Sequence, residues 1–80
     1  MNYYPAKKIK EWCYENLSPL AWQRIILKAL PNVDQSVNYE KLEDPAADYM
    51  LDETTLNALN NATEQIYKVS LPVFRDTNLA

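Results

Sequence analysis

The chain has 80 residues, of which 48% are hydrophobic, and a formal net charge of −3 at pH 7. This length is typical of one domain, and the apolar content excludes a chain that is disordered throughout. There is no histidine and no glycine, which removes the commonest general base and every glycine-dependent phosphate loop or nucleotide fingerprint. We therefore expect a protein that is not an enzyme and that takes no cofactor.

Five prolines divide the chain into segments of helical length. The first predicted helix covers about residues 5–17, where apolar side chains recur at helical spacing from Ile9 to Leu17. Cys13 belongs to this apolar face, and without a histidine to activate it we expect a small buried side chain. A single cysteine forms no disulfide within the chain, and no stretch has the pattern of a secretory signal or a membrane span. These features favour a cytoplasmic protein.

Ser18 followed by Pro19 predicts an N-cap and a first-turn proline. The second helix should then run to Leu30, with Pro31 ending it. Its apolar residues occupy more than half of its circumference, which is typical of a helix at the centre of a fold. Residues 32–43 fit either a short helix or an ordered loop.

Asp44 and Pro45 repeat the pattern of a cap followed by a proline, which predicts a short helix through Leu51. Asp52 either caps the next helix or lies inside a continuous one. The last long helix should extend from about residue 53 to about residue 71, followed by an extended tail over about 72–80. Apolar residues also alternate from residue 67 to 73, so an edge strand remains an alternative over 67–75. The predicted fold is a single all-α domain over 1–80, a compact bundle of three to five short helices with an extended C-terminal tail.

Negative charge is concentrated between residues 40 and 53, where six carboxylates accompany one lysine and give a local charge of −5. Four of these carboxylates recur every four residues, a spacing that would align them on one face of a continuous helix. They could serve as helix caps on a solvated face, as a surface for a cationic partner, or, least favoured, as a weak divalent-cation site. The candidate partner-binding residues are Glu40, Glu43, Asp44, Asp48, Tyr49, Asp52 and Glu53.

The preferred function is a non-catalytic protein-binding module, such as an inhibitor, an antitoxin-like factor or an adaptor of the kind that phages and mobile elements encode. Its acidic face would engage a partner with a basic surface, for example a groove that otherwise holds nucleic acid. Because Asp44 and Asp52 also suit capping, the binding hypothesis depends most on Asp48, Glu40 and Glu43.

Two alternatives remain. Lys7, Lys8 and Lys10, with aromatic residues nearby, could contact nucleic acid, although an overall acidic chain without a broad basic face argues against direct binding. The same lysines could instead pair with the acidic block inside the molecule. The second alternative is a subunit that forms a homodimer through an exposed apolar patch.

Residues 46–59 resemble a run in the haemolysin-expression-modulating family, whose members are small helical proteins that bind a nucleoid-associated partner. The matching residues are Ala46, Ala47, Asp48, Leu51, Glu53, Thr55, Asn57 and Leu59. Pro45 precedes the run, and Tyr49 and Met50 replace the His-Arg of the family pattern. The resemblance implies partner binding through Asp48.

Overall fold

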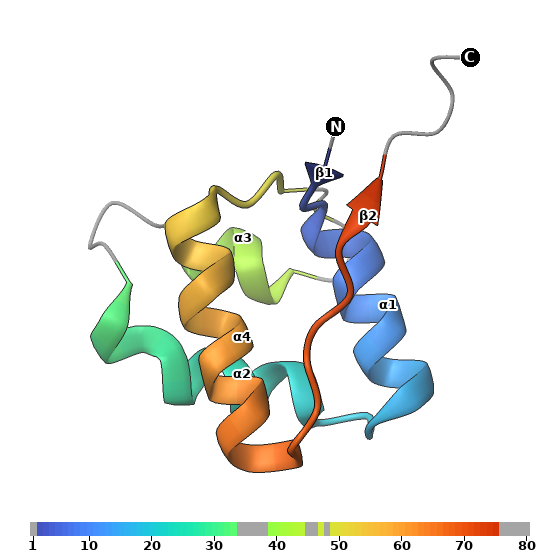
Figure 1. Ribbon diagram of the computed structural model, residues 1–80, viewed down its shortest axis with the longest axis vertical. Helices are drawn as coiled ribbons and strands as arrows, with labels where there is room; N and C mark the ends of the chain where they lie inside the picture. The colour runs from blue at the N-terminus through green and yellow to red at the C-terminus, as the bar shows by residue number, and fades with distance from the viewer. Residues whose placement is uncertain (1, 34–38, 45–46, 48, 76–80) are drawn as a thin grey trace.

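The computed structural model describes residues 2–33, 39–44, 47 and 49–75. It is mostly helical, which confirms the predicted all-α class, and two very short strands accompany the helices (Figure 1). In chain order the elements are β1 (Asn2–Tyr3), α1 (Ala6–Asn16), α2 (Ala21–Ala29), the 3-10 helix η1 (Leu30–Asn32), α3 (Tyr39–Glu43), α4 (Glu53–Tyr67) and β2 (Phe74–Arg75). Within the described residues, no helix is both long enough and apolar enough to cross a membrane.

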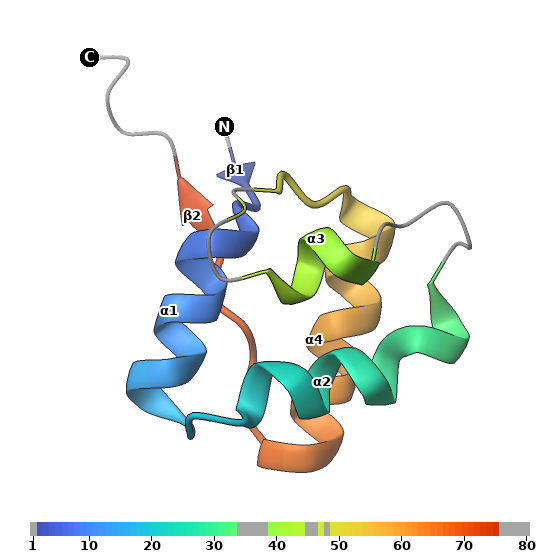
Figure 2. The same ribbon diagram turned by 180° about the vertical axis from the view of Figure 1, so that it is seen from behind.

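Helix α2 lies at the centre of the bundle, as its apolar pattern predicted. It contacts α1, α3 and α4 (Figures 1 and 2). Ile25 is fully buried and Ile26 is 1% exposed. Every α-helix contributes to one core cluster, which includes Ile9, Cys13, Trp22, Ile25, Ile26, Leu42, Leu56, Leu59 and Leu71. Burial of side chains of this size stabilises the fold by about 1.5–3 kcal/mol each, before the loss of chain entropy is subtracted.

The first two helices lie close to their predicted positions, but α2 begins in a different way. No side chain caps its N-terminus, and Leu20 occupies the N-cap position. The backbone N–H of Ala21 donates to the carbonyl oxygen of Ser18 over 3.1 Å, while the buried Ser18 hydroxyl makes no hydrogen bond within the described residues. The prediction that Ser18 caps the helix is therefore wrong, because a backbone turn through Pro19 replaces the side-chain cap.

The short helix predicted through Leu51 is wrong at the residues that are described. Met50 forms an antiparallel bridge with Pro5. The N–H of Ala6 donates to the carbonyl oxygen of Tyr49, and the N–H of Leu51 donates to that of Tyr4, each over 2.8 Å. These hydrogen bonds join residues 49–51 to the segment just before α1 and hold residues 49–51 in an extended conformation. The same backbone groups therefore cannot form the hydrogen bonds of a helix. The 32–43 segment contains a helix, α3, in its described part.

Helix α4 begins at its predicted cap but ends four residues before the predicted end at Leu71. Lys68 adopts the left-handed conformation (φ 63°) and terminates the helix. The chain then turns back, and the N–H of Leu71 donates to the side-chain oxygen of Asn60 over 2.7 Å. The segment returns between α4 and α1 to pair β2 with β1 (Figure 1). The strand alternative therefore holds only for Phe74–Arg75, and residues 76–80 of the predicted tail lie outside the described residues.

Candidate acidic interface

Helix α3 is a single short helix that is held on the core by Leu42. This side chain is 1% exposed, and its carbonyl oxygen accepts a 2.7 Å hydrogen bond from the indole Nε1 of Trp22 on α2. With Leu42 directed inward, Glu40 and Glu43 on the same helix are exposed. One inward residue and one buried hydrogen bond thus orient both carboxylates.

The carboxylates of α3 lie beside α2 and form an open hollow with it. The hollow has a volume of about 360 Å³ and is lined by Gln23, Glu40, Glu43 and Asp44; Figure 2 shows α3 lying next to α2 on this side. These four residues are named the acidic face below. The amide of Gln23 supplies both a donor and an acceptor, so the acidic face contains three carboxylates and one neutral polar group.

A second hollow, of about 240 Å³, continues the acidic face toward α1. It shares Gln23 and Glu43 with the first hollow and adds Lys10 and Tyr14 of α1, of which the Tyr14 side chain is 66% exposed. An exposed aromatic ring beside carboxylates is typical of protein contact surfaces, because tyrosine buries a large area while its hydroxyl stays polar. The surface available to a partner therefore spans α1, α2 and α3.

Tyr39 stabilises the position of Glu43 from within α3. The two residues are one helical turn apart, and the Tyr39 hydroxyl is hydrogen-bonded to the Glu43 carboxylate. Partial burial, followed by the charge of Glu43 and this hydrogen bond, raises the pKa of Tyr39 above its ordinary value of 10.0. Tyr39 therefore stays protonated at neutral pH and remains a donor to Glu43.

Lys10 of α1 links the first helix to the end of α3. Its ammonium donates to the carbonyl oxygen of Asp44 and, over 3.4 Å, to that of Ala47. The N–H of Asp44 donates to the carbonyl oxygen of Glu40 over 2.9 Å and so extends the turn of α3. This contact lowers the net negative charge near Asp44 and fixes its backbone. The lysine contacts the acidic block inside the molecule, as one of the alternatives predicted, and these carbonyl oxygens are among its acceptors.

Asp52 and Glu53 both stabilise the N-terminus of α4. The Asp52 carboxylate accepts a 2.9 Å hydrogen bond from the backbone N–H of Thr55 and caps the helix, as one of the alternatives predicted. Hydrogen bonds from Thr55 hold the pKa of Asp52 below its ordinary value of 3.8. Glu53 is exposed in the first turn of α4, where its charge complements the positive end of the helix dipole.

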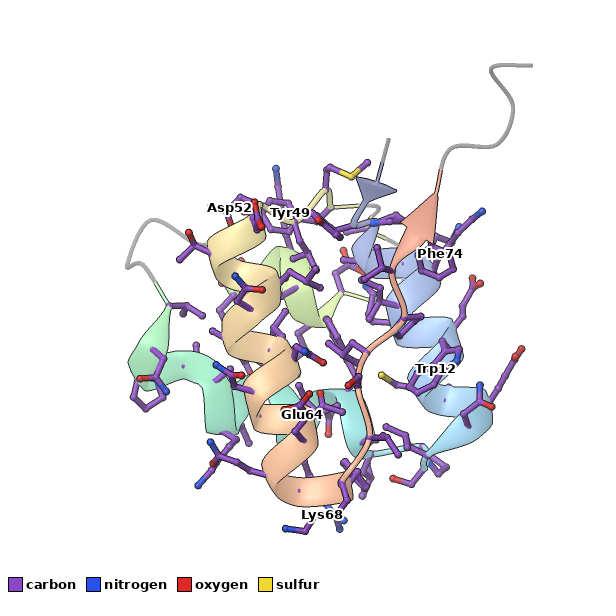
Figure 3. The ribbon with its side chains drawn as sticks, in the orientation of Figure 1. Trp12, Tyr49, Asp52, Glu64, Lys68 and Phe74 are labelled. Carbon is purple, nitrogen blue, oxygen red and sulfur yellow. The ribbon has the colours of Figure 1, made fainter. Side chains whose placement is uncertain are left out.

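The structure brings three of the seven candidate residues together, namely Glu40, Glu43 and Asp44. The half-buried Tyr49 packs against the core and lies at the same end of the molecule as Asp52 (Figure 3). Asp48 lies outside the described residues. Sequence reasoning missed Gln23 and the exposure of Tyr14, because their place in the interface depends on how α1 and α3 pack against α2.

The basic N-terminal group is partly engaged within the molecule. The Lys8 ammonium lies 5.7 Å from the centre of the Phe74 ring, a cation–π contact between α1 and β2. Lys10 makes the carbonyl contacts described above. Both positive charges are thus drawn toward the protein's own groups, which leaves a smaller basic surface than the sequence alone indicated.

Cys13 has the buried position that was predicted. Its side chain is fully buried, and burial raises the pKa of the thiol to about 12. A thiol with so high a pKa is a poor nucleophile at neutral pH. In the described part of the chain, no three side chains of the His, Cys, Asp or Glu type come together to hold a metal ion.

Comparison of the chain with protein-family models, with curated proteins and with solved structures finds no significant match. The short likeness of residues 46–59 to the haemolysin-expression-modulating family therefore supports no assignment.

Proposed function

We propose that this protein is a small non-catalytic binding module whose acidic face engages a basic surface on a protein partner. The observation that carries the proposal is the grouping of Glu40, Glu43 and Asp44 around one hollow, on a helix that Trp22 and Leu42 hold against the core. Carboxylates on a fixed helix attract a cationic partner over a distance of about 10 Å at 0.1 M salt and also select its orientation.

The chemistry of the acidic face favours lysine or arginine side chains as its ligands. An arginine can form paired hydrogen bonds with one carboxylate, and the Gln23 amide can accept a further donor from the same partner. Tyr14 lies at the edge of this surface and adds apolar area. A protein groove that otherwise binds nucleic acid presents such groups, so an inhibitor or antitoxin-like factor of the cytoplasm is the form of the proposal that we favour.

The proposal is tested by affinity capture from an extract of the native host at low salt. The bait is the wild-type chain or the triple variant Glu40→Gln/Glu43→Gln/Asp44→Asn. We expect the wild type to retain a protein that the triple variant does not retain, and we expect a high-salt wash to release it. A partner that the triple variant retains equally well would refute the proposal.

A matched control separates the acidic face from the charge of the whole molecule. Glu15→Gln/Glu53→Gln/Glu64→Gln removes the same number of carboxylates from exposed positions on α1 and α4. We expect this variant to retain the partner as the wild type does. Equal loss of the partner in both triple variants would mean that net charge alone attracts it.

A second candidate function is direct binding of nucleic acid. It is favoured by a hollow of about 190 Å³ in which the exposed Tyr14 ring lies with Lys7, Lys10 and Glu11. An aromatic ring between lysines can stack on a base while the lysines contact phosphate. Titration of a labelled oligonucleotide tests it: Lys7→Gln should weaken binding of the oligonucleotide under this candidate and leave partner capture unchanged under the preferred one.

A further inference from the structure

Helix α2 carries an exposed apolar face that is separate from its buried face. Leu20, at the N-cap, is 53% exposed and Leu27 is 59% exposed. They are seven residues apart, so their side chains project within about 20° of each other on the helix. Exposed leucines two turns apart on one helix are the usual pattern of a helix-to-helix contact.

The two flanks of this face carry opposite charge. On one flank lies Gln23, next to the carboxylates of α3 in the acidic face. On the other flank lie Arg24 and Lys28, both exposed, and Lys28 borders a hollow between α2 and α4. An apolar centre between an acidic and a basic flank is complementary to itself. In a pair of copies, the basic flank of one can face the acidic flank of the other.

The charge pattern also selects the symmetry of such a pair. If two α2 helices met in antiparallel fashion about a twofold axis perpendicular to them, acidic flank would face acidic flank. If the twofold axis ran parallel to α2, the acidic flank of each copy would face the basic flank of the other. Arg24 of one copy would then face the α3 carboxylates of the second copy. Like charges in close contact oppose association and opposite charges favour it, so only the second arrangement satisfies both flanks.

We propose that the chain forms a symmetric homodimer in which the α2 helices pack in parallel through Leu20 and Leu27. A standard interface of about 800 Å² per partner would use roughly 15% of the 5425 Å² exposed by one chain. The proposal goes beyond the proposed function, because the dimer needs no other protein. The dimer and a partner would compete for the same α3 carboxylates, and sedimentation of the purified chain tests the dimer alone.

Sedimentation equilibrium of the purified chain between about 1 µM and 1 mM tests the dimer, a range that covers weak to moderate affinities. We expect the mass to rise from the 9.3 kDa of one chain toward twice that value. The variant Leu20→Gln/Leu27→Gln changes only exposed positions, so it should keep its circular dichroism spectrum and remain monomeric. A wild type that stays monomeric throughout, or a double variant that dimerises as tightly, would overturn the proposal.

A charge exchange tests the facing of the two flanks. Arg24→Glu/Lys28→Glu and Glu40→Lys/Glu43→Lys should each associate with themselves at least about tenfold more weakly than the wild type, the factor that corresponds to 1.4 kcal/mol. An equimolar mixture of the two should recover association. If neither variant weakens association with itself, the flanks do not face each other and the proposed arrangement is wrong.

Cross-linking fixes the direction of the helices. In the parallel dimer like residues meet across the axis, so Leu27→Cys should form a disulfide with its own copy under mild oxidation. The wild type is the control, because its buried Cys13 should form none. If Leu27→Cys links only to Leu20→Cys in a mixture and not to itself, the helices are antiparallel and the proposal fails.

Discussion

The indole Nε1 of Trp22 donates a 2.7 Å hydrogen bond to the carbonyl oxygen of Leu42. This bond joins the central helix α2 to the short helix α3, on which Glu40 and Glu43 lie. A helix of five residues has too few internal hydrogen bonds to be stable alone. The acidic face therefore depends on this contact as much as on its own carboxylates.

Removal of the indole donor should loosen α3. Trp22→Phe leaves the Leu42 carbonyl buried and unpaired, which costs about 1–3 kcal/mol, with a further loss from the smaller ring. Chemical denaturation measures the loss, and hydrogen exchange should show faster opening of the α3 amides. Trp12→Phe, at a half-buried position on α1, is the control and should cost less. Equal losses and unchanged α3 exchange would contradict this role of Trp22.

Asp52 should stabilise the fold in a pH-dependent way. Its pKa is lower in the folded chain than its ordinary value of 3.8, so the stabilisation is present above pH 3.8 and is lost as the pH falls through the folded pKa. At neutral pH, Asp52→Ala should cost about 1 kcal/mol because the Thr55 N–H loses its acceptor. Asp52→Asn keeps an acceptor and should lack this part of the pH dependence. Urea denaturation at several pH values measures both effects; identical acid profiles for wild type and Asp52→Asn would be inconsistent with the cap.

A glycine should stabilise the end of α4. Lys68 has a φ of 63°, a left-handed conformation that costs a residue with a Cβ about 1–2 kcal/mol. After subtraction of the larger entropy that glycine has in the unfolded chain, Lys68→Gly should gain about 0.5–1 kcal/mol. Lys28→Gly, at a helical position in α2, is the matched control and should lose about 1 kcal/mol. Thermal denaturation of both variants should give shifts of opposite sign, and two destabilised variants would contradict the assignment.

The Cys13 thiol should make the fold sensitive to alkali. Burial raises its pKa from 9.0 to about 12, so its contribution is complete below pH 9 and is lost as the pH rises toward 12. Because the tyrosines also titrate in this range, the difference between wild type and Cys13→Ala isolates the thiol. The stability of the wild type should fall more steeply above pH 9 than that of Cys13→Ala. A thiol reagent should also react slowly with the folded chain and rapidly in denaturant; fast reaction with the folded chain would show that Cys13 is accessible.

Local signals in the sequence predicted the helices well. Apolar spacing from Ile9 to Leu17 and the apolar surface of α2 report burial directly, because a helix brings residues three and four apart onto one face. Asp52 before a helical run is a cap signal with a local cause. These features need no knowledge of the rest of the fold.

The errors arose where distant segments meet. Residues 49–51 form backbone hydrogen bonds with Tyr4 and Ala6. No local pattern near Asp44 and Pro45 in the sequence predicts this pairing. In the same way, the side-chain oxygen of Asn60 accepts a hydrogen bond from the N–H of Leu71. This contact holds Leu71 outside α4, so the helix is shorter than predicted. Charge counting found Glu40, Glu43 and Asp44, but it could not show that Gln23 completes their hollow, because this depends on how α3 packs on α2.

The affinity of the captured partner, compared between the two triple variants, tests the central claim most directly. In titrations at low salt, Glu40→Gln/Glu43→Gln/Asp44→Asn should bind at least about tenfold more weakly than the wild type, which corresponds to a loss of 1.4 kcal/mol or more. The control with carboxylates removed from α1 and α4 should stay within about twofold of the wild type, since such exposed charges lie away from the contact. Equal affinities for the two triple variants would contradict the account, because binding would then not depend on the acidic face.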